Sequence, residues 1–582
     1  MYLATLLLAC LFPMKPAVPI GTKISNVTFK DIRYLPRSLD DFKQRQAIVL
    51  VFVDRSCPVA QKYLPILEAM HQQYAARGVQ FVAVNPSPDD SIVEMAGQAV
   101  SLRITFPFVK DFGGRVAKTL GVERVPTAVI LDSQRVLVYR GRVDDSIRLG
   151  GTRPEPTRRD LQTALDETLA GKSVSLAETV IDGCPITFQE ESIGEPVNYA
   201  VHVEPIIRKH CMECHKPGTV APFTLTSFDN VRSKANSIAE VVREERMPPW
   251  YGHPEHGKFI NKRGMTDEER ETILRWIKQG KPSGDLARVP PLPAEFTQAS
   301  EWIIGKPDLV LSTGTYDVPA SGDVEYKYAI LPYVFTEDTW VKDIQIRPDN
   351  NKLVHHANLA FFVVGEKFSM NNFLTGYVPG GVPMILKPGT AVKIPKGSVL
   401  GLQIHFVSIG KPEKGKVKVG LNYARGELNK QVHFRLFVDN RFAIPPEASA
   451  HPVSASWTVP EDIVGIGLFS HMHVRGRDMS FFAQRPGNEK EQLLMIPNYN
   501  FDWQMAYEWA PGTMKFPQGT QFECIAHFDN SSFNAYNPNP KVTVRMGQQT
   551  HEEMMNGFFF YVKEHEKLGL QMNGNTGRVK KE

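Results

Sequence analysis

The hydrophobic pattern of this 582-residue chain changes twice along its length, and each pattern suits a different kind of fold. Residues 20–190 alternate apolar strand-like runs with helix-like stretches. Residues 195–285 show helical periodicity, and beyond residue 300 short strands separated by turn-rich loops replace it. We therefore predict a multidomain protein with an α/β domain, then an all-α domain, then two all-β sandwiches.

Charge and hydropathy narrow the classes of partner. The 67 basic and 63 acidic residues leave a net charge of +4, which does not indicate nucleic acid as a partner. No apolar stretch approaches the ~20 residues that a spanning helix needs, so no transmembrane span is expected. Residues 2–12 (YLATLLLACLF) resemble the core of an export signal, which we expect at residues 1–19.

The first region opens on a continuous apolar run at residues 47–53 (AIVLVFV), the pattern of a buried strand. Cys57 follows it and precedes a stretch with helical spacing at residues 59–76. Further strands are expected at 79–84, 127–131 and 136–139, and a closing helix at 159–170. This order resembles the thioredoxin-like redoxins, and residues 20–190 are expected to form such a domain.

Cys57 is the candidate reactive residue of this domain. It lies at a strand-to-helix junction, where the helix N-terminus favours a thiolate. Residues 125–127 (VPT) match the family's cis-proline position, which faces that thiol. Residues 57–60 read CPVA, so the second cysteine of a CxxC motif is absent and a CxxC dithiol cycle is excluded. Cys57 is left as a peroxidatic thiol, as a partner of Cys184, or as a structural residue.

The second region contains the sequence CMECH at residues 211–215. Two thiols three positions apart on a helical turn reach the two vinyl groups of one haem, and the following histidine then stands over the iron. No second cysteine pair follows that would complete a zinc site. The motif predicts haem c attached through Cys211 and Cys214, with His215 as an axial ligand.

The surrounding pattern resembles a small cytochrome c domain, which we expect at residues 195–285. One helix is expected from Pro205 into the motif, and another opens with the capping box at residues 266–269 and stops at Gly280. The family takes its second axial ligand from a Pro-rich loop, which points to Met247. Its competitor Met265 is expected to pack, and His210 to be a neighbour without a ligand role. The resemblance also implies an extracytoplasmic, bacterial location, in the periplasm or at the cell surface.

A Pro-rich linker is expected at residues 286–300, followed by sandwiches at 301–428 and 429–575. Histidines stand on the predicted strands. His471 and His473 can bind one metal together because residues i and i+2 of a strand share a face. Adjacent His355 and His356 need a bulge or turn to come together. Imidazole with a thioether suits copper.

Here the chain resembles the copper type II, ascorbate-dependent monooxygenases, the family of peptidylglycine α-hydroxylating and dopamine β-monooxygenases. The family has two jelly-roll-like sandwiches, each holding one copper. The resemblance implies O2 activation at the second copper and insertion of one oxygen atom into a substrate C–H bond. By this resemblance the first copper is bound by His355, His356 and His405, and the second by His471, His473 and Met554, with Met555 as the alternative.

Departures from the family limit the substrate. Phe469 stands where the peptide-hydroxylating enzyme has an arginine for a substrate carboxylate, which favours an apolar or aromatic substrate. Arg475 and Arg477 follow the HxH motif and are expected to be loop charges. Cys524 is the single cysteine of this region, so the sandwiches must be held by packing.

The fusion of these regions predicts an oxidoreductase that uses O2 and a small-molecule or peptide substrate. Electrons are expected to come from an ascorbate-like reductant or a redox protein, and to pass through the haem to the copper at His355, His356 and His405. Covalent adjacency favours such a relay. Two alternatives stay open: an electron-transfer protein without hydroxylase activity, and a thiol peroxidase or redox accessory protein that depends on Cys57.

Overall fold

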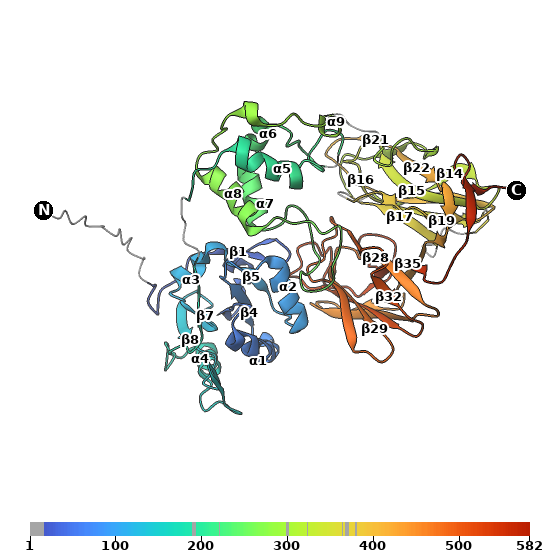
Figure 1. The fold of residues 1–582 in the computed structure, drawn as a ribbon. Helices are drawn as coiled ribbons and strands as arrows, with labels where there is room; N and C mark the ends of the chain where they lie inside the picture. The colour runs from blue at the N-terminus through green and yellow to red at the C-terminus, as the bar shows by residue number, and fades with distance from the viewer. Residues whose placement is uncertain are drawn as a thin grey trace. The chain divides into compact units, whose positions relative to one another are not determined.

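The computed structural model describes residues 17–581 apart from 189–193, 220, 298–301, 323, 364, 367–371 and 379–380. The chain divides into two compact units, Met1–Ser192 and Ile193–Glu582. In Figure 1 the colour runs continuously from blue at the N-terminus to red at the C-terminus, so the first unit is blue to teal and the second is green to red. Most of the expected export signal, residues 1–16, lies outside the described residues.

The first unit is built on one sheet whose central strand is β3 (Ala47–Phe52). All of β3 is buried because helices cover both faces, which accounts for its continuous apolar sequence. It pairs in parallel with β4 (Val79–Asn85) and antiparallel with β7 (Thr127–Asp132). The other strands are β1 (Thr28–Asp31), β2 (Pro36–Ser38), β5 (Phe108–Lys110), β6 (Arg124–Val125), β8 (Leu137–Gly141), β9 (Ile147–Arg148), β10 (Gly151–Thr152) and β11 (Cys184–Pro185).

The strand order of this sheet is β2-β1-β5-β4-β3-β7-β8. Its helices are α1 (Pro58–Ala75), α2 (Ile92–Ser101), α3 (Arg115–Thr119) and α4 (Asp160–Leu169). A capping box at Ser91 opens α2, with the side chains of Ser91 and Glu94 each bonded to the other's backbone N–H. The α/β prediction for the first region is confirmed.

The second unit begins with a helical part whose core is Trp276, which is fully buried with Ile207 and Ile273. The expected capping box is present, because Thr266 accepts from the Glu269 N–H. The helices are η3 (Tyr199–Val203), α5 (Glu204–His210), α6 (Phe228–Ser233), α7 (Ala235–Arg243) and α8 (Asp267–Lys278), and η4 (Leu286–Arg288) and α9 (Ala294–Thr297) follow in the predicted linker.

Two facing sheets form the first β-sandwich. One has the order β12-β22-β15-β19-β24, with β18 also paired to β15, and the other has the order β14-β20-β16-β17. Apolar side chains from both sheets share one core, among them Ile344 and Leu402. The strands are β12 (Leu309–Ser312), β13 (Tyr316–Val318), β14 (Lys327–Val334), β15 (Thr339–Pro348), β16 (Val354–Val363), β17 (Phe373–Tyr377), β18 (Met384–Ile385), β19 (Thr390–Ile394), β20 (Ser398–Phe406), β21 (Glu413–Gly415), β22 (Val417–Tyr423), β23 (Gly426–Leu428) and β24 (Lys430–Gln431).

The second sandwich repeats this arrangement with an aromatic core. Phe522 and Phe559, on opposite sheets, have ring centroids 4.7 Å apart. The sheets are β25-β35-β28-β31, with β32 also paired to β28, and β27-β33-β29-β30. The strands are β25 (His433–Phe437), β26 (Ala443–Ile444), β27 (His451–Thr458), β28 (Ile463–His471), β29 (Gly476–Gln484), β30 (Lys490–Ile496), β31 (Ala506–Glu508), β32 (Met514–Phe516), β33 (Gln521–Phe528), β34 (Val544–Arg545) and β35 (Asn556–Lys563).

After β35 the chain returns to the first sandwich. Strand β36 (Leu570–Asn573) pairs with β23, and β37 (Arg578–Val579) extends this small sheet. The Trp340 N–H donates to the Gly577 carbonyl at 2.7 Å, and Met572 packs in a cluster with Trp340. The two sandwiches are therefore tied together at both ends of the second one.

Candidate functional site

The first histidine group lies on two neighbouring antiparallel strands, β16 and β20. His356 stands opposite His405, and the register shifts between Val354 and His356. This irregularity is the bulge expected from the sequence, and it lets His355 and His356 point to one place. One ring nitrogen from each of His355, His356 and His405 lies within 4.8 Å of the others.

The ring nitrogens of this group are arranged as they would be around a cation. The His355 Nε2–H donates to Asp502 Oδ1 at 2.9 Å, which leaves Nδ1 of His355 3.3 Å from Nδ1 of His356. Nδ1 of His405 and Nε2 of His356 are buried and have no hydrogen-bond partner among the described residues. An unpaired buried nitrogen is costly, and a metal bound in this group would satisfy Nδ1 of His405.

Burial also sets the protonation of these rings. It lowers the pKa of His405 to about 3, with a smaller contribution from the charge of His355. Burial likewise lowers the pKa of His356 well below its usual value, with further lowering by His405. Both rings are therefore neutral at physiological pH, which is the form that binds metals.

The second histidine group lies at the end of β28. His471 is the last residue of the strand and His473 follows it, with ring centroids 5.2 Å apart. The Nδ1–H of His471 donates to Gln504 Oε1 at 2.7 Å, and that of His473 to the Glu552 carbonyl at 3.1 Å. Both bonds leave Nε2 as the free ligand atom, and Nε2 of His473 is buried without a partner among the described residues. Burial lowers the pKa of His471 to about 4 and that of His473 well below its usual value.

The turn that carries Met554 is fixed to this pair by Glu553. The Glu553 carboxylate is fully buried and accepts the backbone N–H groups of His473 at 2.9 Å and Met554 at 3.2 Å. Burial raises the pKa of Glu553 to about 7, although these bonds oppose the shift. Met554 is 4% exposed and its Sδ accepts from Asn556 Nδ2 at 3.5 Å, while Met555 is fully buried.

The expectation that Arg475 and Arg477 are loop charges is wrong. Arg475 is 1% exposed, and its guanidinium donates to Asn530 Oδ1 and to the His551 carbonyl, both at 2.9 Å. Its backbone N–H also donates to Glu553 at 2.6 Å. Arg477 donates to the Ser449 carbonyl at 3.3 Å. Arg475 therefore holds the turn of Glu553 against the strand of the histidines.

One segment of the second sandwich contacts both histidine groups. Phe501 stacks on His355 with ring centroids 4.6 Å apart, and Asp502 and Gln504 bind His355 and His471 as described above. The rings of His356 and His471 lie 5.8 Å apart. The sequence does not identify Asp502 or Gln504, because no motif or spacing links these residues to the histidines. The structure thus brings the two predicted histidine groups together.

The residues of the CMECH motif follow α5. Both thiols are free and half-buried, and burial raises the pKa of Cys211 to about 12 and also raises that of Cys214. The His215 Nδ1–H donates to the Phe223 carbonyl at 3.0 Å, which leaves Nε2 as the free ring nitrogen. Burial lowers the pKa of His215. The donor set and its orientation fit a haem attached at this turn.

Three other residues were singled out around this motif, and the axial role expected of Met247 stays a prediction. Met247 is half-buried in the turn after α7 and precedes a cis peptide bond to Pro248. Met265 packs against the core of the helical part, as expected. His210 forms a pair with Glu269, Nε2 to Oε2, at 3.0 Å.

In the first unit, Cys57 forms a disulfide with Cys184. Cys57 is the N-cap residue of α1, and its Sγ lies 3.5 Å from the Val125 carbonyl oxygen. The peptide bond between Val125 and Pro126 is cis, as expected, and the carbonyl that precedes it contacts Cys57. The sequence left three roles open for Cys57, and the structure shows one of them, the disulfide with Cys184.

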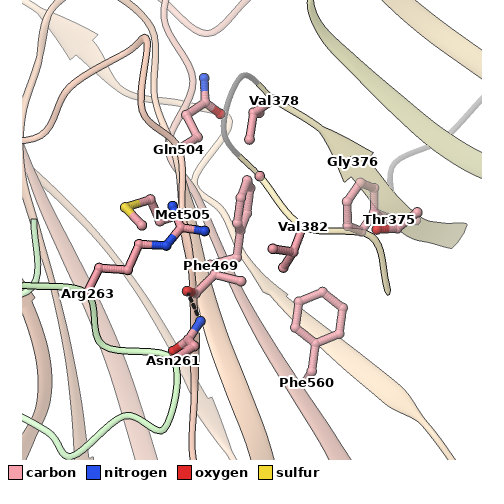
Figure 2. Close-up of a pocket in the computed structure, with 13 residues that line it drawn as sticks. Asn261, Arg263, Thr375, Gly376, Val378, Val382, Phe469, Gln504, Met505 and Phe560 are labelled. Atoms are coloured by element: carbon pink, nitrogen blue, oxygen red, sulfur yellow. Dashed lines mark hydrogen bonds between the residues drawn. The ribbon is translucent and has the colours of Figure 1, made fainter. Parts of the chain in front are cut away.

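A pocket adjoins the second histidine group. Gln504, the partner of His471, lies in its wall, and Figure 2 shows apolar side chains around it. Its cavity volume is about 100 Å³. Asn261 ties the loop before α8 to this wall, since its Nδ2 donates to the Ala506 carbonyl at 2.9 Å. The lining side chains are mainly apolar or neutral: Phe373, Thr375, Val378, Val382, Phe469, Gln504, Met505, Ala506, Phe560, Asn261 and Arg263.

No helix among the described residues is both long and apolar enough to cross a membrane.

Comparisons with known proteins match the first unit. Residues 20–140 match the model of the AhpC/TSA family. The thiol-disulfide oxidoreductase ResA of Bacillus thuringiensis subsp. konkukian is 27% identical over 121 residues, which cover 21% of this chain and 68% of the relative. ResA of Geobacillus thermodenitrificans is 26% identical with the same coverage.

Solved structures are also similar to a part of this chain. A hypothetical protein from Sinorhizobium meliloti 1021 is 27% identical and covers 30% of this chain and 98% of its own, with a TM-score of 0.29. A putative thiol:disulfide interchange protein DsbE from Chlorobium tepidum is 20% identical and covers 26% and 99%, with a TM-score of 0.23. On the family model and the ResA relatives, the N-terminal part of this chain is a thioredoxin-like redoxin domain, similar to the AhpC/TSA family and to ResA.

Proposed function

We propose that residues 301–575 bind two copper ions and form a copper-dependent monooxygenase, which inserts one oxygen atom of O2 into a substrate C–H bond. The observation that carries this proposal is the convergence of buried, neutral imidazoles with unpaired nitrogens in two adjoining groups. Copper in these groups would supply one-electron redox chemistry and O2 activation.

The proposed ligands are oriented by their hydrogen-bond partners. Asp502 accepts from Nε2 of His355, so that Nδ1 of this ring faces the first group. Gln504 accepts from Nδ1 of His471, so that Nε2 faces the second. Such outer partners fix ring orientation and ligand basicity. His356 and His405 complete the first proposed copper site; His473 and Met554 complete the second, with Met555 as the alternative.

The pocket beside Gln504 supports an apolar or aromatic substrate, as a small molecule or within a peptide. Phe469 lines it and packs on Phe558 with ring centroids 5.7 Å apart. An apolar wall binds a substrate by excluding water and leaves orientation to a few polar groups, which here include Gln504 and Arg263.

For residues 195–285 we propose a cytochrome c domain, with haem c attached to Cys211 and Cys214 and bound by His215 and Met247. The free thiols at this turn and the orientation of His215 support it. The haem would supply one-electron transfer. Because such attachment takes place outside the cytoplasm in bacteria, the protein is proposed to be extracytoplasmic, in the periplasm or at the cell surface.

We propose that electrons from an ascorbate-like reductant or a redox protein reach the first copper site through this domain. One contact supports the proposal: Asn351 Nδ2 donates to the Gly218 carbonyl at 3.5 Å. Gly218 follows His215 closely in sequence, and Asn351 closely precedes His355. The turn after the CMECH motif therefore contacts the turn that precedes β16, the strand of His355 and His356.

The thioredoxin-like domain is proposed to carry out thiol-disulfide exchange as an accessory to these centres. The disulfide between Cys57 and Cys184 at the helix N-terminus supports this role. A thiol peroxidase led by Cys57 remains the alternative for this domain. For the rest of the chain the alternative is electron transfer through haem and copper without hydroxylation.

Metal analysis, a haem spectrum and O2 uptake with ascorbate test the proposal on the full chain. We expect two copper ions and one haem per chain, and O2 uptake that stops in His473→Ala. The control His565→Ala alters an exposed histidine outside both groups and should keep the wild-type values. A haem-loaded chain that takes up no copper would refute the monooxygenase. Two copper ions without any O2-dependent product would favour the electron-transfer alternative.

A further inference from the structure

A short strand near the end of the first unit, β11, pairs with the short strand β6 beside Cys57. In this pairing β11 runs antiparallel to β6, with Cys184 opposite Val125. The contact continues on both sides, because the Ile186 N–H donates to the Glu123 carbonyl at 2.8 Å and Arg124 Nη1 donates to the Gly183 carbonyl at 2.7 Å. The segment is thus held mainly by backbone bonds, as in peptides that add a strand to a sheet edge.

The fit between this segment and the edge is close at Gly183. A Cβ atom on this residue would lie 2.1 Å from the Val125 carbonyl oxygen, so only glycine allows the two backbones to approach. Beyond it, side chains alternate as in a strand. Ile186 is buried, and the ring of Phe188 lies 4.7 Å from the Lys118 ammonium. Cys184, Ile186 and Phe188 therefore face the domain.

The two cysteine residues of the disulfide differ in exposure. Cys57 is 1% exposed, whereas Cys184 is half-buried. An incoming thiolate therefore reaches Cys184 more easily. Cys57 is then the leaving group, and its thiolate departs at the N-terminal end of α1, where the helix dipole stabilises negative charge.

We propose that the β6 edge is a docking site for an extended polypeptide that carries a cysteine in a disulfide, that β11 covers this site in the oxidised protein, and that Cys184 is the resolving cysteine. The proposal rests on the thiol-disulfide function proposed above. The bound polypeptide has a cysteine followed two and four residues later by apolar side chains, the pattern that Cys184, Ile186 and Phe188 present to the same surface.

The cycle balances in electrons and protons. A dithiol reductant is oxidised to its disulfide and leaves Cys57 and Cys184 as thiols, so that β11 is released. The Cys57 thiolate attacks the polypeptide disulfide, forms a mixed disulfide and expels one polypeptide thiolate, which takes up a proton. The Cys184 thiolate then attacks the Cys57 sulfur, re-forms the original disulfide and expels the second thiolate. Return of β11 to the edge displaces the polypeptide in the same step.

The first test uses the full chain and a nonapeptide whose cysteine is followed at the second and fourth positions by Ile and Phe, supplied as its disulfide-linked dimer. Dithiothreitol-reduced, desalted Cys184→Ser should accumulate a mixed disulfide of Cys57 with one peptide, seen by peptide mass mapping. The reduced wild type should release two peptide thiols without a lasting adduct, and Cys57→Ser should form none at this position. A lasting adduct in the wild type equal to that of Cys184→Ser would refute the resolving role.

Docking is tested with a second peptide that has Ser in place of Ile and Phe, and with dithiodipyridine as a small disulfide. The apolar peptide should react with reduced Cys184→Ser about tenfold faster than the Ser peptide, while dithiodipyridine reacts readily with Cys57. Equal peptide rates would refute the docking site and leave thiol-disulfide exchange standing. A Cys57 that reacts with none of these disulfides would instead refute the proposed exchange function.

A backbone variant tests the cover formed by β11. Gly183→Ala should weaken the pairing with β6 and speed reduction of the Cys57–Cys184 disulfide by dithiothreitol about tenfold, because the added Cβ meets the Val125 carbonyl. Gly151→Ala is the matched control, since a Cβ there meets open space within the same unit. Reduction of Gly183→Ala at the wild-type rate would refute the cover.

Discussion

Acidification of the metal-free protein is expected to destabilise the sandwiches through their buried histidines. Burial holds the pKa of His405 at about 3 and that of His471 at about 4, whereas both regain the ordinary value of 6.5 in the unfolded chain. Below pH 6.5 the unfolded chain binds protons that the folded protein does not. The stability is therefore complete above pH 6.5 and is lost as the pH falls toward 4 and then 3.

The size of the effect follows from the same pKa values. A pH of 5 lies about 1.5 units below the pKa of histidine in the unfolded chain, and each pH unit corresponds to about 1.4 kcal/mol. Each of the two imidazoles should thus lower the free energy of unfolding by about 2 kcal/mol between pH 7 and pH 5.

Urea unfolding of chelator-treated protein at pH 7 and pH 5 measures this loss, followed by the fluorescence of Trp340, Trp457 and Trp509 in the sandwiches. In His405→Gln the difference between the two pH values should shrink by about 2 kcal/mol, because this side chain does not titrate. His565→Gln, at an exposed position, should keep the wild-type difference. The reasoning is refuted if His405→Gln retains the full wild-type pH dependence.

Other substitutions test the packing around the sites by urea unfolding or thermal melting. Arg475→Met should lower the free energy of unfolding of the second sandwich by about 1–3 kcal/mol, because it removes the hydrogen bonds that the buried guanidinium donates to Asn530 and to the His551 carbonyl. A loss as small as that of Arg477→Met would contradict this. Leu402→Ala should lower the free energy of unfolding of the first sandwich by about 2–5 kcal/mol, because the side chain is fully buried. A smaller loss would mean that neighbouring side chains fill the cavity. Thr266→Ala should cost the helical part about 1 kcal/mol, since it removes the N-cap of α8, and unchanged far-ultraviolet melting would show that the cap contributes nothing.

The sequence by itself determined the local elements, because their causes are local. The apolar run at residues 47–53 contains the buried strand β3, because a short run rich in β-branched residues suits a strand that is covered on both faces. The capping box of α8 formed because Thr266 and Glu269 meet within one turn. The adjacent pair His355 and His356 required a strand irregularity, and the register shift supplies it.

Tertiary structure alone decided which distant groups meet. Asp502 and Gln504 reach His355 and His471 through a loop whose path depends on how the sandwiches pack, and no periodicity records such a path. From the sequence Arg475 is expected to be an exposed charge, whereas in the structure the turn of Glu553 covers it. The pairing of Cys57 with Cys184 likewise needs β11 to lie along β6, a contact between segments far apart in the chain. Patterns of a few residues specify helices and strands, whereas contacts across long sequence separations depend on the packing of the whole domain.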